Sequence, residues 1–240
     1  MSLKLAVVGH GKMGREVESV ARERGHDVVV VKRGDAFAAG RDVAIEFTHA
    51  GAVLGNVQAA LAAGARVVVG TTGWEAQRSE VERAVAAAGG GLVHAANFSV
   101  GVNLFYRIVK DAAAVMAAFS DYDPYVLERH HRMKKDAPSG TAKALVAIVE
   151  AAPGATKKGL AAFEGALPAG GFHVASLRAG GIVGEHTVGF DSGGDEILLE
   201  HRARSRRGFA LGSVLASEWL STRKGIFSFD AVIEDLVRKQ

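Results

Sequence analysis

The segment from Glu128 to Ala142, E-R-H-H-R-M-K-K-D-A-P-S-G-T-A, holds the residues of this chain best suited to chemistry. Two adjacent histidines and two lysines stand just before a Pro-Ser-Gly-Thr sequence that is typical of a helix start. A histidine can donate a proton near neutral pH, and the free N–H groups of a helix N-terminus can bind an anion. The segment therefore predicts a site for an anionic substrate that is protonated during a reaction.

The expected helix covers residues 139–152, with Ser139 as its N-cap. The backbone N–H groups of Gly140 and Thr141 then have no partner inside the helix, so both could bind a substrate carboxylate. An ordinary capped helix without a ligand explains the same residues. The cationic and titratable neighbours favour the binding interpretation.

The two histidines, His130 and His131, fall on an expected strand over residues 125–132. Successive side chains of a strand point to opposite faces, so one ring can face a cleft while the other packs. Glu128 and Asp136 could join them as metal ligands, but the lysines and arginines in between would repel a cation. We therefore expect no metal.

A second segment, G-H-G-K-M-G, follows the apolar run at residues 3–8 and opens an expected helix. In this context G-x-G-x-x-G is typical of a dinucleotide-binding turn, because its glycines allow a tight turn, close approach to a pyrophosphate and close helix packing. A glycine-rich turn without a ligand is the alternative. The expected cofactor-binding residues here are Val8, Gly9, His10, Gly11, Lys12, Met13 and Gly14.

The second expected strand ends in a basic pair, Lys32 and Arg33, with no acid before Asp35. An NAD-preferring site usually has an acid here for the ribose hydroxyls, whereas basic side chains suit a 2′-phosphate. We therefore expect NADPH to be preferred over NADH. The simpler interpretation is that these side chains are merely solvated at a strand end.

Two further loops follow expected strands of the same sheet. Ligands of open α/β sheets lie beyond the carboxyl ends of the strands, so both loops are candidates to line the cofactor, although ordinary connecting loops would look alike. Their candidate cofactor-binding residues are Gly70, Thr71, Thr72, Ala95, Ala96, Asn97 and Phe98.

Strand and helix patterns alternate up to about residue 96, which predicts an α/β fold with a Rossmann-type, doubly wound parallel sheet. After that point a long helix, three glycine-separated strands and an expected loop over 153–171 predict a second, α+β substrate domain with an open mixed sheet. The final helices return to the first domain. We expect a dinucleotide-binding domain of residues 1–97 plus 212–240, and a substrate-binding and oligomerisation domain of residues 98–211.

The composition narrows the function classes. The chain has 240 residues, of which 48% are apolar, as in a folded globular protein, and it has no cysteine. The lack of cysteine excludes disulfides and thiolate sites and fits a cytoplasmic protein. A formal net charge of +3 does not indicate nucleic-acid binding, and no apolar run or leader pattern indicates a membrane.

The chain resembles the 4-hydroxy-tetrahydrodipicolinate reductase (dihydrodipicolinate reductase) family of the diaminopimelate and lysine pathway. The most specific similarity is the string E-R-H-H-x-x-K-x-D-A-P-S-G-T-A. Further similar segments are Gly9 to Gly14, Gly70 to Gly73, Ala95 to Asn103 and Arg178 to Phe190. The resemblance as a whole runs over nearly the entire chain.

The resemblance implies a role for each matching residue. His130 matches the family's general acid, Lys134 its substrate-polarising cation and His131 a substrate-contacting histidine. Gly140 and Thr141 match the amides that hold a substrate carboxylate, and the loops after the strands match cofactor contacts. The resemblance also implies a cytoplasmic homotetramer.

The chain departs from the family pattern in the short segment Lys32 to Arg41, where many members are longer, and at Glu46, where Asp is common. Because the shorter segment would cover less of the cofactor's adenine side, it weakens the expected preference for NADPH.

The expected reaction is therefore NAD(P)H-dependent reduction of a cyclic, unsaturated dicarboxylate, 4-hydroxy-tetrahydrodipicolinate, to tetrahydrodipicolinate. Two alternatives stay open on the sequence. One is another cysteine-free Rossmann dehydrogenase that acts on an open-chain carbonyl compound. The other is a nucleotide-sensing protein that binds NADPH without turnover.

Overall fold

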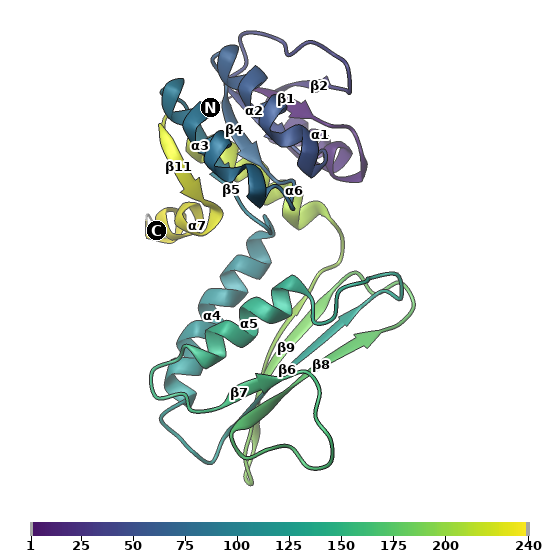
Figure 1. Ribbon diagram of the computed structural model, residues 1–240, viewed down its shortest axis with the longest axis vertical. Helices are drawn as coiled ribbons and strands as arrows, with labels where there is room; N and C mark the ends of the chain where they lie inside the picture. Colours follow the sequence, from purple (N-terminus) through teal and green to yellow (C-terminus); the bar gives the residue numbers. More distant parts are fainter. Residues whose placement is uncertain (1, 239–240) are drawn as a thin grey trace. The chain divides into compact units, whose positions relative to one another are not determined.

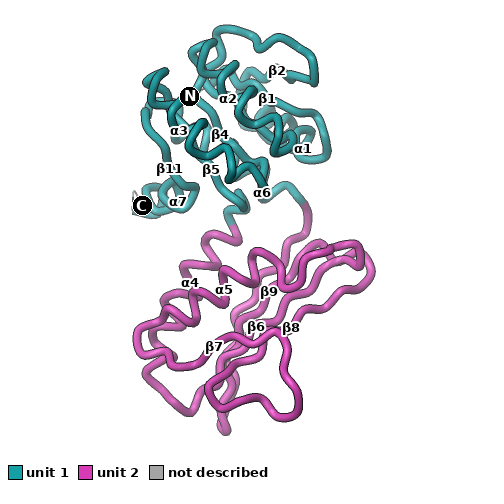
Figure 2. Tube along the Cα trace, in the orientation of Figure 1, with its two compact units in different colours: residues 1–100, 206–240 teal, residues 101–205 magenta. Residues whose placement is uncertain are grey.

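The computed structural model describes residues 2–238, which divide into two compact units (Figures 1 and 2). Unit 1 comprises residues 1–100 and 206–240, and unit 2 comprises residues 101–205. The sequence expectation placed the divisions at 97/98 and 211/212. The whole of helix α6, Arg207–Leu220, packs with α1, Lys12–Glu23, in unit 1.

Unit 1 contains a six-stranded sheet in which every neighbouring pair is parallel, as expected. In spatial order its strands are β11 (Gly225–Ser228), β5 (Gly91–His94), β4 (Arg66–Val69), β3 (Val43–Glu46), β1 (Lys4–Val8) and β2 (Asp27–Val31). The sequence reading missed β11, because four residues at the edge of a sheet give little periodic signal.

Helices cover both faces of this sheet. The side chains of β1 divide between two apolar cores, since Leu5 and Val7 join one and Ala6 and Val8 the other. This division shows why the strands read as continuous apolar runs. The helical elements of unit 1, besides α1 and α6, are η1 (Ala50–Ala52), α2 (Val53–Ala62), η2 (Glu75–Gln77), α3 (Arg78–Ala87) and α7 (Phe229–Arg238).

Unit 2 contains a five-stranded mixed sheet, as expected. In spatial order its strands are β10 (Glu196–Arg202), β9 (Glu185–Asp191), β6 (Asp123–His130), β8 (Gly171–Arg178) and β7 (Lys158–Leu160). The β6–β8 and β7–β8 pairs are parallel, whereas the β6–β9 and β9–β10 pairs are antiparallel. Strand β7 falls in the stretch 153–171 that was expected to be a loop, because its sequence, K-G-L, is too short to show alternation.

The helices of unit 2 are α5 (Gly140–Glu150) and α4 (Val100–Met116), the latter beginning at the last residue of unit 1. Both contribute to one core with the sheet, in which Phe105 and Leu145 pack with Val126 and Phe172. Along β6 the residues at every second position, Val126, Glu128 and His130, are buried. The apolar face of the strand thus continues into a polar end.

Candidate active site

The polar end of β6 is the centre of a cluster of charged and titratable side chains. The sheet register places Glu128 opposite His186 of β9, and His130 opposite Arg178 of β8. Because side chains two residues apart on a strand share a face, Glu128 and His130 point the same way. Because β6 lies between β8 and β9, side chains from three strands meet at one site.

Glu128 is fully buried and uses both carboxylate oxygens. Its Oε2 is hydrogen-bonded to Nδ1 of His130. Its Oε1 accepts from Nη2 of Arg178 at 2.6 Å and from the backbone N–H of Ser139 at 3.3 Å. Burial alone would raise the pKa of this carboxyl, but the hydrogen bonds from Arg178, Ser176 and His130 outweigh burial and lower the pKa.

The His130 ring is also buried. Burial lowers its pKa, the Glu128 carboxylate opposes that shift, and the charges of Lys134 and Arg178 reinforce it. The ring is therefore mostly neutral at neutral pH in the free protein. An ionised carboxylate can only accept hydrogen bonds, so Nδ1 carries a proton toward Glu128 and Nε2 is the nitrogen that faces away.

His186 extends this network. Its ring lies edge-on to His130, with 5.1 Å between the ring centroids, and its Nε2 is 3.2 Å from Oγ of Ser139. Burial, with the nearby His130, lowers the pKa of His186 to about 4. The sequence reading gave no role to His186 or Arg178, because their contacts with β6 depend on strand register across long sequence separations.

The start of α5 is as expected, with Ser139 in an extended conformation at the N-cap. Its Oγ accepts from the N–H of Ala142 at 3.2 Å. Gly140 is exposed and Thr141 is half-buried at the first turn. The N–H groups of such a first turn point along the helix axis and suit a carboxylate.

The loop after β6 contains the other two residues expected at the substrate site, His131 and Lys134. β6 spans Asp123–His130, so the expected strand over 125–132 is shifted by two residues. Half-buried His131 begins a turn in which its carbonyl accepts from the N–H of Lys134 at 3.0 Å. The Lys134 ammonium pairs with Asp136 at 2.8 Å. Nη2 of Arg178 also donates to the carbonyl of Asp136 at 2.6 Å, which ties the loop to β8.

Glu128, His130 and His186 have potential metal-ligand atoms within 4.8 Å of one another. The Arg178 guanidinium contacts the same carboxylate, and the charge of Lys134 acts on both rings. These cations disfavour a metal ion at this place. A hydrogen-bonded network in which Glu128 binds both His130 and Arg178 explains the cluster better than a metal site does.

The glycine loop of unit 1 fits a bound pyrophosphate. Gly9 has φ +94°, and a Cβ atom there would lie 2.4 Å from the Phe47 carbonyl oxygen. A Cβ atom at Gly14 would lie 2.0 Å from the carbonyl oxygen of Gly9, whereas one at Gly11 would have no described atom within 4 Å. Two glycines therefore allow tight packing and the third leaves open space before the helix N-terminus.

The remaining loop candidates occupy the same end of the sheet. Val8 is the buried last residue of β1, and Lys12 and Met13 form the first turn of α1. His10 Nε2 lies 2.8 Å from Oε2 of Glu18, an interaction within unit 1. Its ring is therefore already engaged by α1.

Lys32 and Arg33 directly follow β2, and both are exposed. The backbone N–H of Lys32 donates to Oδ2 of Asp35 at 2.9 Å, so this acid closes the turn. The two basic side chains thus lie beside the end of β1 through the β1–β2 pairing.

Gly70, Thr71 and Thr72 follow β4 at the same sheet edge. A Cβ atom at Gly70 would lie 2.2 Å from the Phe47 ring, and buried Thr71 accepts from the N–H of Thr48 at 2.8 Å. Thr72 is exposed. The loop is therefore packed on one side and open on the other.

The loop after β5 contains half-buried Ala95, exposed Ala96, then Asn97 and Phe98. Oδ1 of Asn97 accepts from the N–H of Ser99 at 2.8 Å, and Phe98 is buried between Phe47 and Phe229. Phe98 therefore acts as a packing anchor for the loop.

Glu46, at the end of β3, is fully buried. Its Oε1 accepts from Thr48, through both the backbone N–H and the hydroxyl, and from Asn56. The longer acid at this position thus orders the loop that follows β3.

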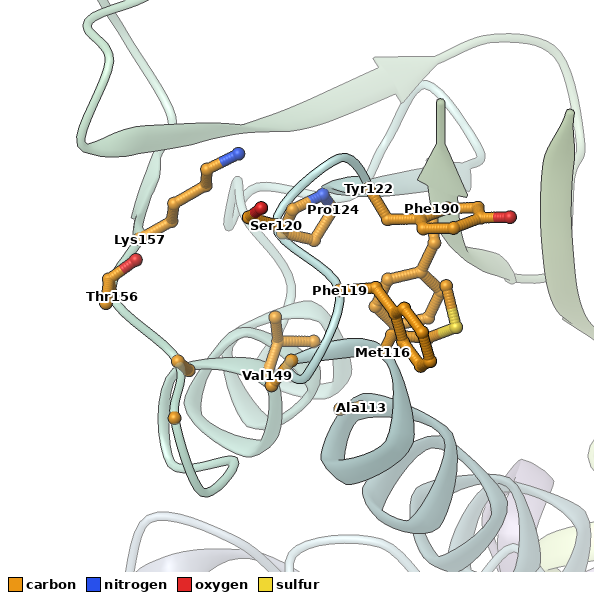
Figure 3. Close-up of a pocket in the computed structure, with 13 residues that line it drawn as sticks. Ala113, Met116, Phe119, Ser120, Tyr122, Pro124, Val149, Thr156, Lys157 and Phe190 are labelled. Carbon is orange, nitrogen blue, oxygen red and sulfur yellow. The ribbon is translucent and has the colours of Figure 1, made fainter. Parts of the chain in front are cut away.

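Unit 2 also contains a cavity of about 110 Å³ (Figure 3). Its wall includes Met116, Phe119 and Val149, and Lys157 at its edge is paired with Asp123. Pro124 of the lining lies at the start of β6, about 20 Å of strand from His130 at the rise of an extended chain. The cavity therefore does not belong to the candidate site.

Within residues 2–238, no helix has both the length and the apolar character to cross a membrane.

Two family models match the chain in succession. The model for the N-terminal part of dihydrodipicolinate reductase matches residues 18–98, and the model for its C-terminal part matches residues 101–233. The boundary between the matches coincides with the first boundary between the two units of the structure.

Relatives in sequence and structure agree with these matches. A 4-hydroxy-tetrahydrodipicolinate reductase of Methanosarcina barkeri is 39% identical over 228 residues, covering 93% of this chain and 81% of the relative. One from Christiangramia forsetii is 33% identical over 98% of this chain and 100% of the relative. The fold is similar to that of a dipicolinate-bound dihydrodipicolinate reductase from Paenisporosarcina sp. TG-14, with a TM-score of 0.74 and 23% identity over 96% of this chain and 99% of that one.

Proposed function

This chain belongs to the dihydrodipicolinate reductase family, and we propose that it reduces 4-hydroxy-tetrahydrodipicolinate to tetrahydrodipicolinate in diaminopimelate and lysine biosynthesis. The observation that carries this proposal is the hydrogen-bonded Glu128–His130 pair beside the N-terminus of α5. It combines a titratable donor and an anion-binding helix start in one unit, while the other unit carries the glycine loop.

In the proposed reaction, a hydride and a proton enter the substrate and the 4-hydroxyl group leaves as water. The nicotinamide, when bound, supplies the hydride. His130 donates the proton from Nε2, and Lys134 polarises the ring of the substrate. The N–H groups of Gly140 and Thr141 hold one carboxylate, and His131 contacts the substrate.

The lowered pKa of His130 fits this role if proton uptake accompanies substrate binding. The substrate carries two negative charges, which stabilise the protonated ring and raise its pKa. The proton then arrives with the substrate, and the closed network around Glu128 holds the ring in place. A positioned acid of this kind contributes ~10²–10⁴ in rate.

For the cofactor, the family requires a nicotinamide dinucleotide, and we propose NADPH in preference to NADH. Exposed Lys32 and Arg33 after β2 support a 2′-phosphate site, since Asp35 is committed to the turn. The three loops after β1, β4 and β5, with the residues described above, form the rest of the proposed cofactor site.

We further propose a homotetramer that assembles through the sheet of unit 2 and works in the cytoplasm. Support comes from apolar side chains left exposed on that sheet, such as Leu177 on β8 and Leu198 on β10. Sedimentation of the purified protein measures the assembly directly.

A coupled assay tests the reaction. The preceding synthase supplies the substrate, and loss of nicotinamide absorbance follows its reduction. Turnover that depends on the synthase supports the proposal. A protein that oxidises NADPH only with open-chain carbonyl compounds, or that binds NADPH without turnover, contradicts it.

A further inference from the structure

We propose that Glu128 is a positioning residue that fixes the tautomer of His130 and ties this ring to the N-terminus of α5. The inference deepens the proposed function and rests on it. Arg178 completes the device by holding the second carboxylate oxygen of Glu128.

Glu128 determines which nitrogen of the His130 ring carries the proton. Oε2 of Glu128 is bonded to Nδ1 of His130, and a carboxylate has no proton to give. The neutral ring therefore keeps its proton on Nδ1, and Nε2 becomes the site that gains and loses the catalytic proton. Gly184 lies against Nε2, where a Cβ atom would come within 3.1 Å, so the absence of a side chain there leaves this nitrogen uncovered.

Glu128 also contacts the N-terminus of helix α5. Oε1 of Glu128 accepts from the N–H of Ser139, whose Oγ caps α5 by accepting from Ala142. One side chain thus links the proposed proton donor to the proposed carboxylate site. This link fixes the distance between the proton donor and the site for the substrate's carboxylate. That distance matters because a substrate must reach both groups at once.

The charges around His130 act in opposing directions. Glu128 on the same strand favours the protonated ring, whereas Arg178 on β8 and Lys134 in the loop disfavour it. His186 on β9 packs edge-on to the ring and is itself uncharged near neutral pH, because burial lowers its pKa to about 4. Removing Glu128 or Arg178 should therefore shift the His130 titration oppositely. An ion pair that lies away from His130 would give no such pair of opposite shifts.

The test compares Glu128→Gln with Arg178→Gln and a matched control, Glu200→Gln. Glu200 also pairs with an arginine, Arg129 of the same strand β6, at 3.0 Å, but on the opposite face of the sheet from Glu128 and His130. Nitrogen NMR shifts of the imidazoles, with His130 assigned by comparison with His130→Gln, report tautomer and titration. Steady-state kinetics across pH gives kcat and KM separately.

We expect Glu128→Gln to lower kcat roughly 10-fold to 100-fold, part of the ~10²–10⁴ that a positioned acid supplies. Its Nδ1–H population should fall and the His130 titration should move to lower pH. Arg178→Gln should move the titration to higher pH, and Glu200→Gln should move nothing. The Kd of the cofactor should stay at the wild-type value in all three.

Glu128→Gln with wild-type kcat and an unchanged His130 tautomer would overturn the proposal. So would shifts of the same sign in both site variants. If Glu128→Gln fails to fold, the shift in Arg178→Gln decides, because its guanidinium lies at the edge of the cluster. The NMR arms need no turnover, so a wild-type protein that does not reduce the ring substrate refutes the proposed function without deciding the tautomer.

Discussion

The glycine loop of unit 1 and the polar cluster of unit 2 are built in different ways. The loop uses backbone atoms within a few consecutive residues, and its specificity lies in side chains that are missing. The cluster uses side chains from three strands, a loop and a helix N-terminus, held by mutual hydrogen bonds. A phosphate site can therefore be encoded by a few consecutive residues, whereas this proton-transfer site needs three neighbouring strands.

The largest expected effect sharpens this contrast by removing the donor. His130→Gln should lower kcat by ~10²–10⁴, because no other group replaces the proton donor. The Kd of NADPH should not change, since the ring belongs to the other unit. Steady-state kinetics measures kcat, and fluorescence titration measures the Kd of NADPH. A near-normal kcat would refute the acid role.

The next test challenges the idea that the loop works through missing side chains. Gly14→Ala should destabilise unit 1 by about 1–3 kcal/mol or more, because the Cβ atom would press on the Gly9 carbonyl oxygen. Gly11→Ala, where the space is open, is the matched control and should keep stability while weakening cofactor binding. Urea unfolding and cofactor titration separate them. Equal stability losses in both variants would contradict the assigned division of roles.

The polar cluster should also make stability depend on pH. The pKa of His186 is about 4 when folded and near its ordinary value of about 6.5 when unfolded, so the unfolded chain binds more protons between these values. Its contribution, about 3 kcal/mol, is fully present above pH 6.5 and is lost as pH falls toward 4.

Unfolding measured from pH 7 to 4 checks this loss, with His186→Gln expected to flatten the dependence. His49→Gln, at an exposed histidine, is the control and should leave the curve as it is. A slope that persists unchanged in His186→Gln would assign the effect elsewhere.

The smallest effect concerns side chains at the edge of the loop site. Replacing Lys32 and Arg33 by Ala should lower the preference for NADPH over NADH about 10-fold, as expected for losing an exposed charge-assisted hydrogen bond of ~1.5 kcal/mol. The ratio of kcat/KM for the two cofactors measures it. Arg24→Ala, which removes a guanidinium paired with Glu218, is a control that should leave this ratio unchanged.

The contrast also explains what could be predicted from the sequence. The loop of Gly9, Gly11 and Gly14 and the helix start at Ser139 depend on neighbours in the chain, and both are found as expected. His186 and Arg178 reach Glu128 only because β9 and β8 flank β6, which no local pattern encodes. Short strands such as β7 and β11 escaped for the related reason that edges carry weak periodicity.

The central position of β6 affects the order in which the sheet of unit 2 unfolds. Unfolding β6 requires breaking its ladders to β8 and β9 together, whereas β7 and β10 each have one neighbour. Local opening free energies should therefore rise from the edge strands to the centre, so that amides of β6 exchange with solvent among the slowest in unit 2. The proton donor sits in the part of its unit that is last to come apart.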